Sequence, residues 1–398
     1  MKQSLLLKGY LALFCILIFS LPFSDVATSV PNIILVLLIA FFPFCLKGKK
    51  REDFQNQTVY LYLILILYIT LNIVSFGNFN SELSQLGKLY LPAGIFVLSI
   101  PIKNYLKELK IFVVLGVFFG VIISMGSIFM YIYKTGDFNF SSGKAINEVL
   151  ILERVYIAFL CVISFVVSLD LFKHYRKLML LNIAVLVVFV LLIAARMALI
   201  SIVLIAFLYM IKKLDKRKVL IVLGLGTILL AGFFMTNKNL QNRFFYKDQD
   251  NSFMKNLAIW EPRMVIWPCV YDITKKENYN MINGLASYNL QEKELLDCYD
   301  RSIDHKEKRE WFLFIKYNTH NQFLDFLLVS GILGLIIFVS FFVFAFWKNR
   351  HSFFSVSLIL SFLLIGLVEN YFHRQVGVYC FGVFLIFLME NRKKSIIN

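Results

Sequence analysis

The chain has 398 residues, 59% of them hydrophobic, and a mean hydropathy of +0.73. Soluble domains are roughly 45–50% apolar, so this composition excludes an ordinary soluble protein. The formal net charge is +16. Most Lys and Arg residues lie in short loops between apolar runs, which is typical of a membrane protein and not of a nucleic-acid-binding protein. We therefore expect membrane lipid, and no nucleic acid, as a partner.

Twelve apolar runs approach the ~20 residues that a helix needs to cross a bilayer. No small-residue cleavage site follows the first run, so we expect a retained span and not a signal peptide. The sequence predicts an all-α polytopic membrane protein with about twelve spans. They lie at 4–22, 30–46, 58–76, 84–101, 111–133, 150–171, 178–194, 196–211, 219–236, 321–347, 353–369 and 375–390.

The segments between these runs alternate in charge, which indicates the orientation of the chain. One set is nearly free of Lys and Arg, and the other carries basic clusters at 47–51, 103–110, 173–177, 212–218, 348–350 and 392–394. The positive-inside rule then predicts that both termini are cytoplasmic. The polar segment that follows the ninth span is expected outside. We divide the chain into spans one to nine (1–236), an outer loop with part of the active site (237–320), and the last three spans with a cytoplasmic tail (321–398).

An almost unbroken apolar run at 178–211 contains Arg196 near its middle. One helix of that length would be about 50 Å long and would put two basic clusters on opposite sides of the membrane. Two short spans with a tight outer turn avoid both problems and place Arg196 at the outer edge. An arginine there either snorkels to the interface or binds an anion.

Arg263 follows early in the polar segment, in IWEPRMVIWPCV. It is either an ordinary solvated arginine or a second cation at the outer edge, and its Trp neighbours can equally mark an interfacial helix.

His320 stands at the start of the tenth span, in NTHNQFLDFLLVSGILGLIIF. We expect Asn318 or Thr319 to cap that helix. A histidine at a helix start is often structural, but histidine is also the usual proton acceptor near neutral pH. Asn321 and Asp325 follow, and Asp325 is a candidate to orient the imidazole.

Two further features carry polar chemistry. The outer turn VENYFHRQVG holds Glu369, His373 and Arg374 and is either a solvated loop or charge support for a site. Cys269 and Cys298 both fall in the polar segment and can form a disulfide if that segment is extracytoplasmic. No cysteine or histidine has metal-ligand spacing, so we expect no metal.

These pieces together resemble one family. RMVIW, the NG about twenty residues later, and HNQFLDFLLVSGILGL are similar to the signature region of the O-antigen ligase and polymerase family. The resemblance covers the topology of the whole chain and, in detail, residues 194–201 and 259–377. Where many members show Gly-x-Gly in the loop, this chain has Asn283-Gly284-Leu285-Ala286.

The resemblance implies a fold like that of C-type glycosyltransferases, with a large outer loop between spans nine and ten. It implies metal-independent, inverting transfer of a polysaccharide from undecaprenyl diphosphate to a sugar hydroxyl of lipid A core. The reaction takes place on the periplasmic face of the bacterial inner membrane, and no cofactor is implied. Arg196 and Arg263 match the diphosphate-binding positions and His320 the proton acceptor. Glu369, Arg374, Asn321 and Asp325 are expected to support them.

Three other functions are left open. A polymerase of O-antigen, capsule or exopolysaccharide repeat units differs from a ligase only in its acceptor. A twelve-span transporter would carry ionisable groups near the span centres, which here are nearly free of charge. A binding or scaffolding membrane protein would not need arginines and a histidine on one face.

Overall fold

The computed structural model describes residues 2–46, 56–136, 143–213 and 261–389, with Gly232 and Met235 between the last two ranges. Within these ranges the chain is helical, without strands, and has one isolated bridge between Asn280 and Gly284. Five helical stretches there are long and apolar enough to cross a bilayer. The chain is therefore a helical, polytopic membrane protein. The ninth expected span, 219–236, lies outside the described residues.

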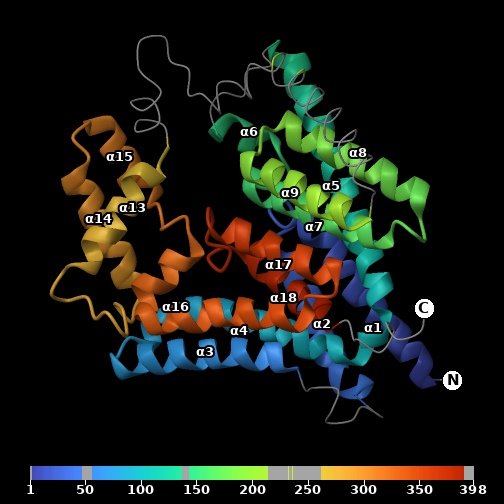
Figure 1. Cartoon of the computed structure of the whole chain (residues 1–398), viewed down its shortest axis with the longest axis horizontal. Coiled ribbons are helices and arrows are strands. Elements are labelled where there is room, and N and C mark those ends of the chain that lie inside the picture. The colour runs from blue at the N-terminus through green and yellow to red at the C-terminus, as the bar shows by residue number, and fades with distance from the viewer. Residues whose placement is uncertain are drawn as a thin grey trace.

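Every other expected span contains a helix (Figure 1). A 3-10 turn, η3 (Ile100–Tyr105), joins the fourth and fifth of them, and a short helix, α6 (Gly143–Val149), precedes the sixth. The helices are α1 (Lys2–Ser20), α2 (Ser29–Cys45), α3 (Gln57–Ser75), α4 (Phe79–Ser99), α5 (Leu106–Thr135), α7 (Arg154–Leu171), α8 (Arg176–Leu192), α9 (Arg196–Lys213), α16 (Gln322–Asn349), α17 (Phe353–Gly366) and α18 (Gln375–Phe387).

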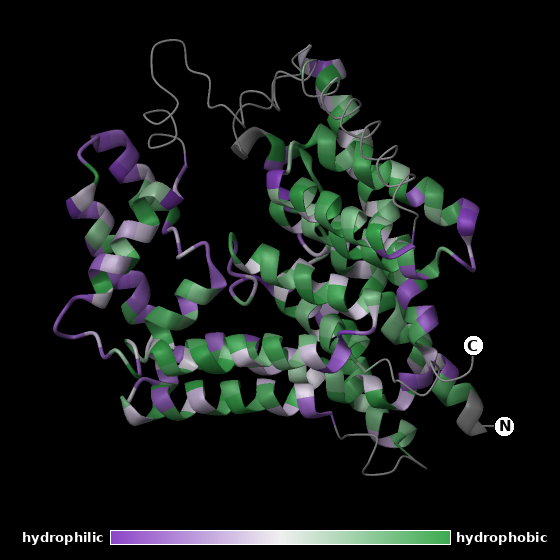
Figure 2. Cartoon of the chain, viewed as in Figure 1, coloured by the Kyte–Doolittle hydropathy of each residue, from purple (hydrophilic) through white to green (hydrophobic). Residues whose placement is uncertain are grey.

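Two helices form the centre of the bundle. Every residue from Val376 to Leu388 along α18, and from Tyr156 to Ser168 along α7, is buried. α18 packs on α4, and α7 packs on α5, α8 and α17. Here protein, and not lipid, surrounds these two apolar helices. The outer helices instead expose apolar side chains, which suits contact with lipid. Figure 2 shows that hydrophobic residues predominate along the bundle.

The last two helices are shorter than expected. α17 has 14 residues and α18 has 13, about 20 Å each at 1.5 Å per residue, whereas the hydrocarbon core is about 30 Å thick. The connecting turn folds into the protein, because Glu369, Asn370, Tyr371 and Phe372 are all buried. Non-helical backbone is tolerated at such a place only when protein surrounds it.

The run at 178–211 is broken into α8 and α9, as expected. The turn between them contains no glycine, and Ala194 takes a left-handed conformation with φ of 50°. Arg196 is the first residue of α9. The turn therefore presents the guanidinium group at a helix start, next to the polar outer segment.

The outer segment forms a small helical unit: α13 (Arg263–Thr274), α14 (Tyr288–Ser302) and α15 (Lys306–Ile315). It lies at the left in Figures 1 and 2, and hydrophilic residues gather there. Its apolar side chains form a second hydrophobic core, to which Leu328 of α16 contributes. A disulfide between Cys269 and Cys298 joins α13 to α14.

This outer unit is attached to α16 at a break in that helix. Gly331 has φ of 64° and ψ of −168°. Beside it, the carbonyls of Leu328 and Val329 accept N–H groups of the 281–286 segment at 2.8 and 2.9 Å. A Cβ added to Gly284 would lie 2.5 Å from the Leu328 carbonyl oxygen. The Asn-Gly of the sequence motif therefore permits a close approach between loop and helix.

Candidate active site

The backbone of His320 is strained where it enters α16. Its φ is 43°, a left-handed conformation that costs a non-glycine residue roughly 1–3 kcal/mol. The side-chain oxygen of Asn318 accepts the His320 N–H at 3.0 Å. The expectation that Asn318 or Thr319 caps α16 is wrong, because the Oδ1 of Asn321 accepts the N–H groups of Phe323 and Leu324. The cap thus lies after His320 and leaves its ring outside the helix.

His320 pairs with Glu369, which lies on the buried turn between α17 and α18. The His320 Nδ1 and the Glu369 Oε2 are 3.4 Å apart, and the His320 side chain is 25% exposed. Burial raises the pKa of Glu369, but the hydrogen bond and charge of His320, the N–H of Asn370 and the charge of Arg263 together lower it below its ordinary value. An ionised Glu369 keeps the Nδ1–H tautomer, so Nε2 can accept a proton.

Asn370 connects this turn to the start of α16. Its Oδ1 accepts the N–H of Asn321 at 2.6 Å and the hydroxyl of Thr319 at 3.2 Å. Thr319 and Asn321, the neighbours of His320, are therefore hydrogen-bonded directly to Asn370, the neighbour of Glu369. These bonds fix the backbone of His320 relative to that of Glu369.

Asp325 does not contact His320, although the sequence made it a candidate orienter. It lies one turn into α16 and is fully buried, and its oxygens bond His373 Nε2 at 3.0 and 3.1 Å. Gln291, Gln322 and Asn370 donate to the same carboxylate at 2.8, 3.2 and 3.0 Å. The role of imidazole partner belongs to Glu369, and Asp325 instead links α14, α16 and the α17–α18 turn.

The two predicted arginines lie side by side. Glu261 bonds both of them, accepting Arg196 at 3.0 Å and Arg263 through its other oxygen. Arg263 also donates to the Val368 carbonyl at 2.7 Å, which places it directly before Glu369. Its Nε is buried and has no partner among the described residues. The sequence motif contains Glu261, but nothing local indicated that it bridges to Arg196 sixty-five residues away.

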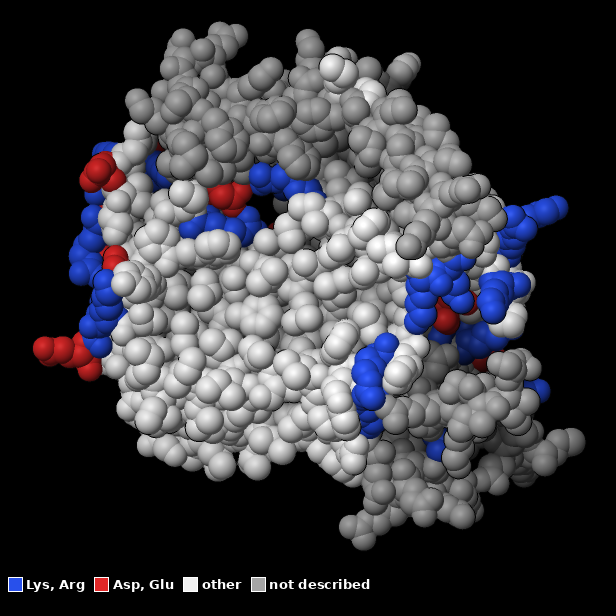
Figure 3. Space-filling model, viewed as in Figure 1, with Lys and Arg blue, Asp and Glu red and all other residues white. Residues whose placement is uncertain are grey.

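A pocket of about 120 Å³ lies at these arginines. Arg196, Arg263 and a third arginine, Arg154 at the start of α7, line its polar part. Apolar residues of α7, α9 and α17, and of the turn after α17, line much of the rest: Val155, Ala158, Phe159, Val162, Ala198, Ile365 and Val368. Figure 3 shows basic and acidic side chains around a hollow between the outer unit and the bundle. Sequence analysis missed Arg154, because it lay inside the sixth predicted span.

Arg374 lies at the rim and not in the pocket lining. It forms an ion pair with Glu153 at 3.4 Å, and its side chain is mostly exposed. Burial raises the pKa of Glu153, with Arg374 opposing this and Glu369 adding to it. Of the predicted supporting residues, Glu369 pairs with His320 and Asn321 caps α16. Asp325 lies in a separate buried cluster with His373, and Arg374 lies at the rim of the pocket.

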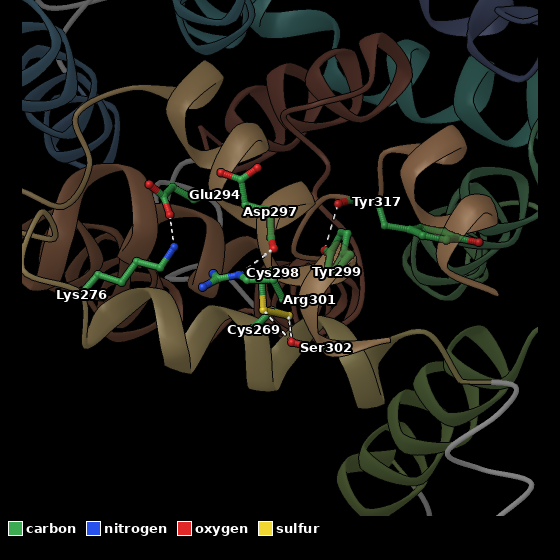
Figure 4. The surroundings of a disulfide bond; sticks show 9 residues. All are labelled: Cys269, Lys276, Glu294, Asp297, Cys298, Tyr299, Arg301, Ser302 and Tyr317. Atoms are coloured by element: carbon green, nitrogen blue, oxygen red, sulfur yellow. Dashed lines mark hydrogen bonds and ion pairs between the residues drawn. A yellow bond between two sulfur atoms is a disulfide. The ribbon is translucent and has the colours of Figure 1, made fainter. Parts of the chain in front are cut away.

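The outer unit fixes the position of Arg263 and of the segment before His320. The disulfide joins α13, which begins at Arg263, to α14, and Lys276 forms an ion pair with Glu294 nearby (Figure 4). Tyr299 of α14 donates to the Tyr317 carbonyl at 3.1 Å. Both groups of candidate residues therefore depend on one cross-linked scaffold.

Chemically, the site combines a cationic pocket with an apolar wall and a neighbouring imidazole paired to a carboxylate. Guanidinium groups bind phosphate oxygens and stay charged, and an imidazole held in this way can act as a general base. Among the residues described in the structure, no cluster of His, Cys, Asp or Glu has the arrangement of a metal site.

The family model described as O-antigen ligase matches residues 181–339, from α8 into α16. The match includes Arg196, Arg263, His320 and Asp325, while Arg154, Glu369 and Arg374 lie outside it. No curated protein matches the chain. The resemblance read from the sequence is thereby confirmed over this region, which is similar to the O-antigen ligase family.

Proposed function

We propose that the protein is an O-antigen ligase that transfers a polysaccharide from undecaprenyl diphosphate to a sugar hydroxyl of lipid A core. The observation that carries this proposal is the contact of Arg263 with Val368, one residue before Glu369, which holds His320. The contacts of an anion-binding group and of a general base thus lie on two adjacent residues of one turn.

In the proposed reaction, Arg196, Arg263 and Arg154 hold the diphosphate, and the apolar wall of the pocket takes the first part of the lipid. His320 Nε2 removes the proton from the acceptor hydroxyl. The acceptor oxygen bonds to the anomeric carbon as the bond from that carbon to the phosphate oxygen breaks, with inversion. The arginines stabilise the negative charge that gathers on the departing diphosphate. The reaction needs no metal, because arginines take the place that a cation has in other phosphate sites.

The proposal places twelve spans in the inner membrane, with both termini cytoplasmic and the loop 237–320 on the periplasmic face. The charge alternation supports this orientation, and the Cys269–Cys298 disulfide is typical of an oxidising compartment.

Cysteine labelling tests this topology. A cysteine at the exposed Glu277 should react with a membrane-impermeant thiol reagent in cells with a permeabilised outer membrane, and one at Lys213 should not. The four free native cysteines are buried and give a low background. The opposite labelling pattern would overturn the orientation.

Reconstitution tests the activity. The purified protein is given a defined undecaprenyl-linked donor together with lipid A core in one reaction and a second undecaprenyl-linked glycan in the other. A ligase joins the donor glycan to lipid A core and continues at the same rate when a chelator is added. Transfer only to the second undecaprenyl-linked glycan would identify a polymerase, and no transfer to either acceptor would contradict both.

A further inference from the structure

Two aromatic residues lie at the segment Lys316–His320: Trp267 of the outer unit contacts it, and Tyr317 belongs to it. The indole N–H of Trp267, on α13, donates to the Thr319 carbonyl at 3.3 Å. The ring of Tyr317 lies 5.5 Å from the ring of His320. His320 therefore has one aromatic ring beside its own, and a second aromatic residue is bonded to the backbone of its neighbour Thr319.

These rings are fixed in place. Tyr317 packs on Phe312 with ring centroids 4.8 Å apart, its hydroxyl accepts the indole N–H of Trp311 at 3.2 Å, and its carbonyl accepts Tyr299. Figure 4 shows its ring pointing away from the disulfide. The disulfide at Cys269 anchors α13 two residues after Trp267. Rigid aromatic groups lose little conformational entropy on binding a ligand.

The same rings are not buried. Trp267 is 40% exposed, and Tyr317 is partly exposed. The face of an aromatic ring carries partial negative charge and attracts the polarised C–H groups on one face of a sugar ring. A sugar whose hydroxyl lies within ~3 Å of His320 has its ring over the residues that surround that histidine. The position and chemistry of these aromatic groups thus fit a carbohydrate.

We propose that Trp267 and Tyr317 form a stacking site for the sugar ring of the acceptor that carries the reacting hydroxyl. This inference rests on the proposed function where it takes His320 as the base. The other role for an exposed tryptophan in a membrane protein is anchoring at the lipid interface. An anchor leaves its indole N–H to the interface, whereas Trp267 donates its own to the backbone beside His320.

Binding to the full chain in nanodiscs tests the site without requiring turnover. The probes are two soluble glycans: the core oligosaccharide released from lipid A, and the oligosaccharide of one O-antigen repeat unit. We expect one of them to bind the wild type, and Trp267→Ala and Tyr317→Ala each to raise its Kd about tenfold, the 1.4 kcal/mol that one such ring contributes. Trp267→Phe keeps a ring without the N–H and should bind within a few-fold of wild type.

Two comparisons make the result decisive. Tyr271→Ala removes an exposed aromatic ring one turn further along α13 and should leave Kd unchanged; equal weakening by Tyr271→Ala and Trp267→Ala would show interfacial anchoring and overturn the site. The assay measures glycan binding and not transfer, so failure of the proposed chemistry does not alter the binding result. A wild type that binds neither glycan would overturn the stacking site. In turnover assays, Trp267→Ala should raise KM for the acceptor and leave KM for the donor unchanged.

Discussion

The part of the chain that the structure describes contains two histidine–carboxylate pairs near the start of α16, and their surroundings differ. In the first, His320 is partly exposed and meets Glu369 at 3.4 Å, beside the arginine pocket. In the second, His373 meets a fully buried Asp325 at 3.0 Å, and three amide groups donate to the same carboxylate. A buried carboxylate whose oxygens all accept hydrogen bonds holds structure together, whereas a partly exposed imidazole with one ring nitrogen left to accept a proton is free for chemistry.

The largest expected effect separates the two histidines. His320→Gln keeps hydrogen bonding but cannot act as a base, so transfer should fall at least ~100-fold with normal membrane levels and normal donor binding. Transfer within a few-fold of wild type would remove His320 from the mechanism. His373→Gln is the matched control; it should lower the Tm of the purified protein, and any folded protein should retain most of its activity.

Substitution of the two carboxylates, Asp325 and Glu369, should affect the stability of the fold unequally. Asp325→Asn places an amide among four donors and should destabilise the fold by about 3–5 kcal/mol, as expected when one partner of a buried pair is removed. Thermal unfolding in detergent measures this. Glu369→Gln should destabilise the fold less than Asp325→Asn, because its partner His320 is partly exposed, and it should lose activity, because it removes the group that orients His320. Equal losses of stability in both variants would show that the His320–Glu369 pair is as structural as the His373–Asp325 pair.

The bundle could be predicted from the sequence, because long apolar runs and basic loops are strong local signals. The short lengths of α17 and α18 could not, since the burial of Glu369 and Asn370 depends on partners just before α16, His320 and Asn321, that no local pattern reveals. The same reason explains why Asp325 appeared to be an orienter: sequence spacing places it near His320, but its partner His373 is forty-eight residues away.

The loop motif shows what a sequence departure means physically. Ala286 stands at the second position of the Gly-x-Gly that many family members have, and its φ is 51°. A glycine takes this conformation without strain, so the motif reflects backbone geometry, which alanine keeps here at a cost. Arg154 and Glu261 were missed for another reason. Each resembles an ordinary residue at the end of a helix until distant segments bring it to the pocket.

Substitution of the pocket arginines tests whether the His320–Glu369 pair lies at a substrate-binding site. Arg196→Lys and Arg263→Lys each keep the charge and lose the planar fork. Transfer should fall about tenfold to a hundredfold, the effect of one hydrogen bond of 1.5–3 kcal/mol to a charged group, while the protein still inserts. Arg350→Lys, at the other end of α16, is the control and should be silent. Full activity of both Lys variants would make Arg196 and Arg263 interface anchors.

The smallest expected effect concerns pH, and it sharpens the role given to Glu369. The pKa of Glu369 lies below its ordinary value of ~4.3 because His320, Asn370 and Arg263 outweigh the effect of burial. A carboxylate with a lowered pKa stabilises the folded state above its unfolded pKa, and that stability is lost only as the pH falls through the folded value. Between pH 5.5 and 8.5 the group is therefore always ionised. Infrared difference spectra between the wild type and Glu369→Gln should then show an ionised carboxylate for Glu369 at every pH in this range. A protonated carboxyl band that appears as the pH falls from 7 to 6 would mean that Glu369 takes up a proton there. In that case Glu369 would have to be tested as the base itself, in place of the group that orients His320.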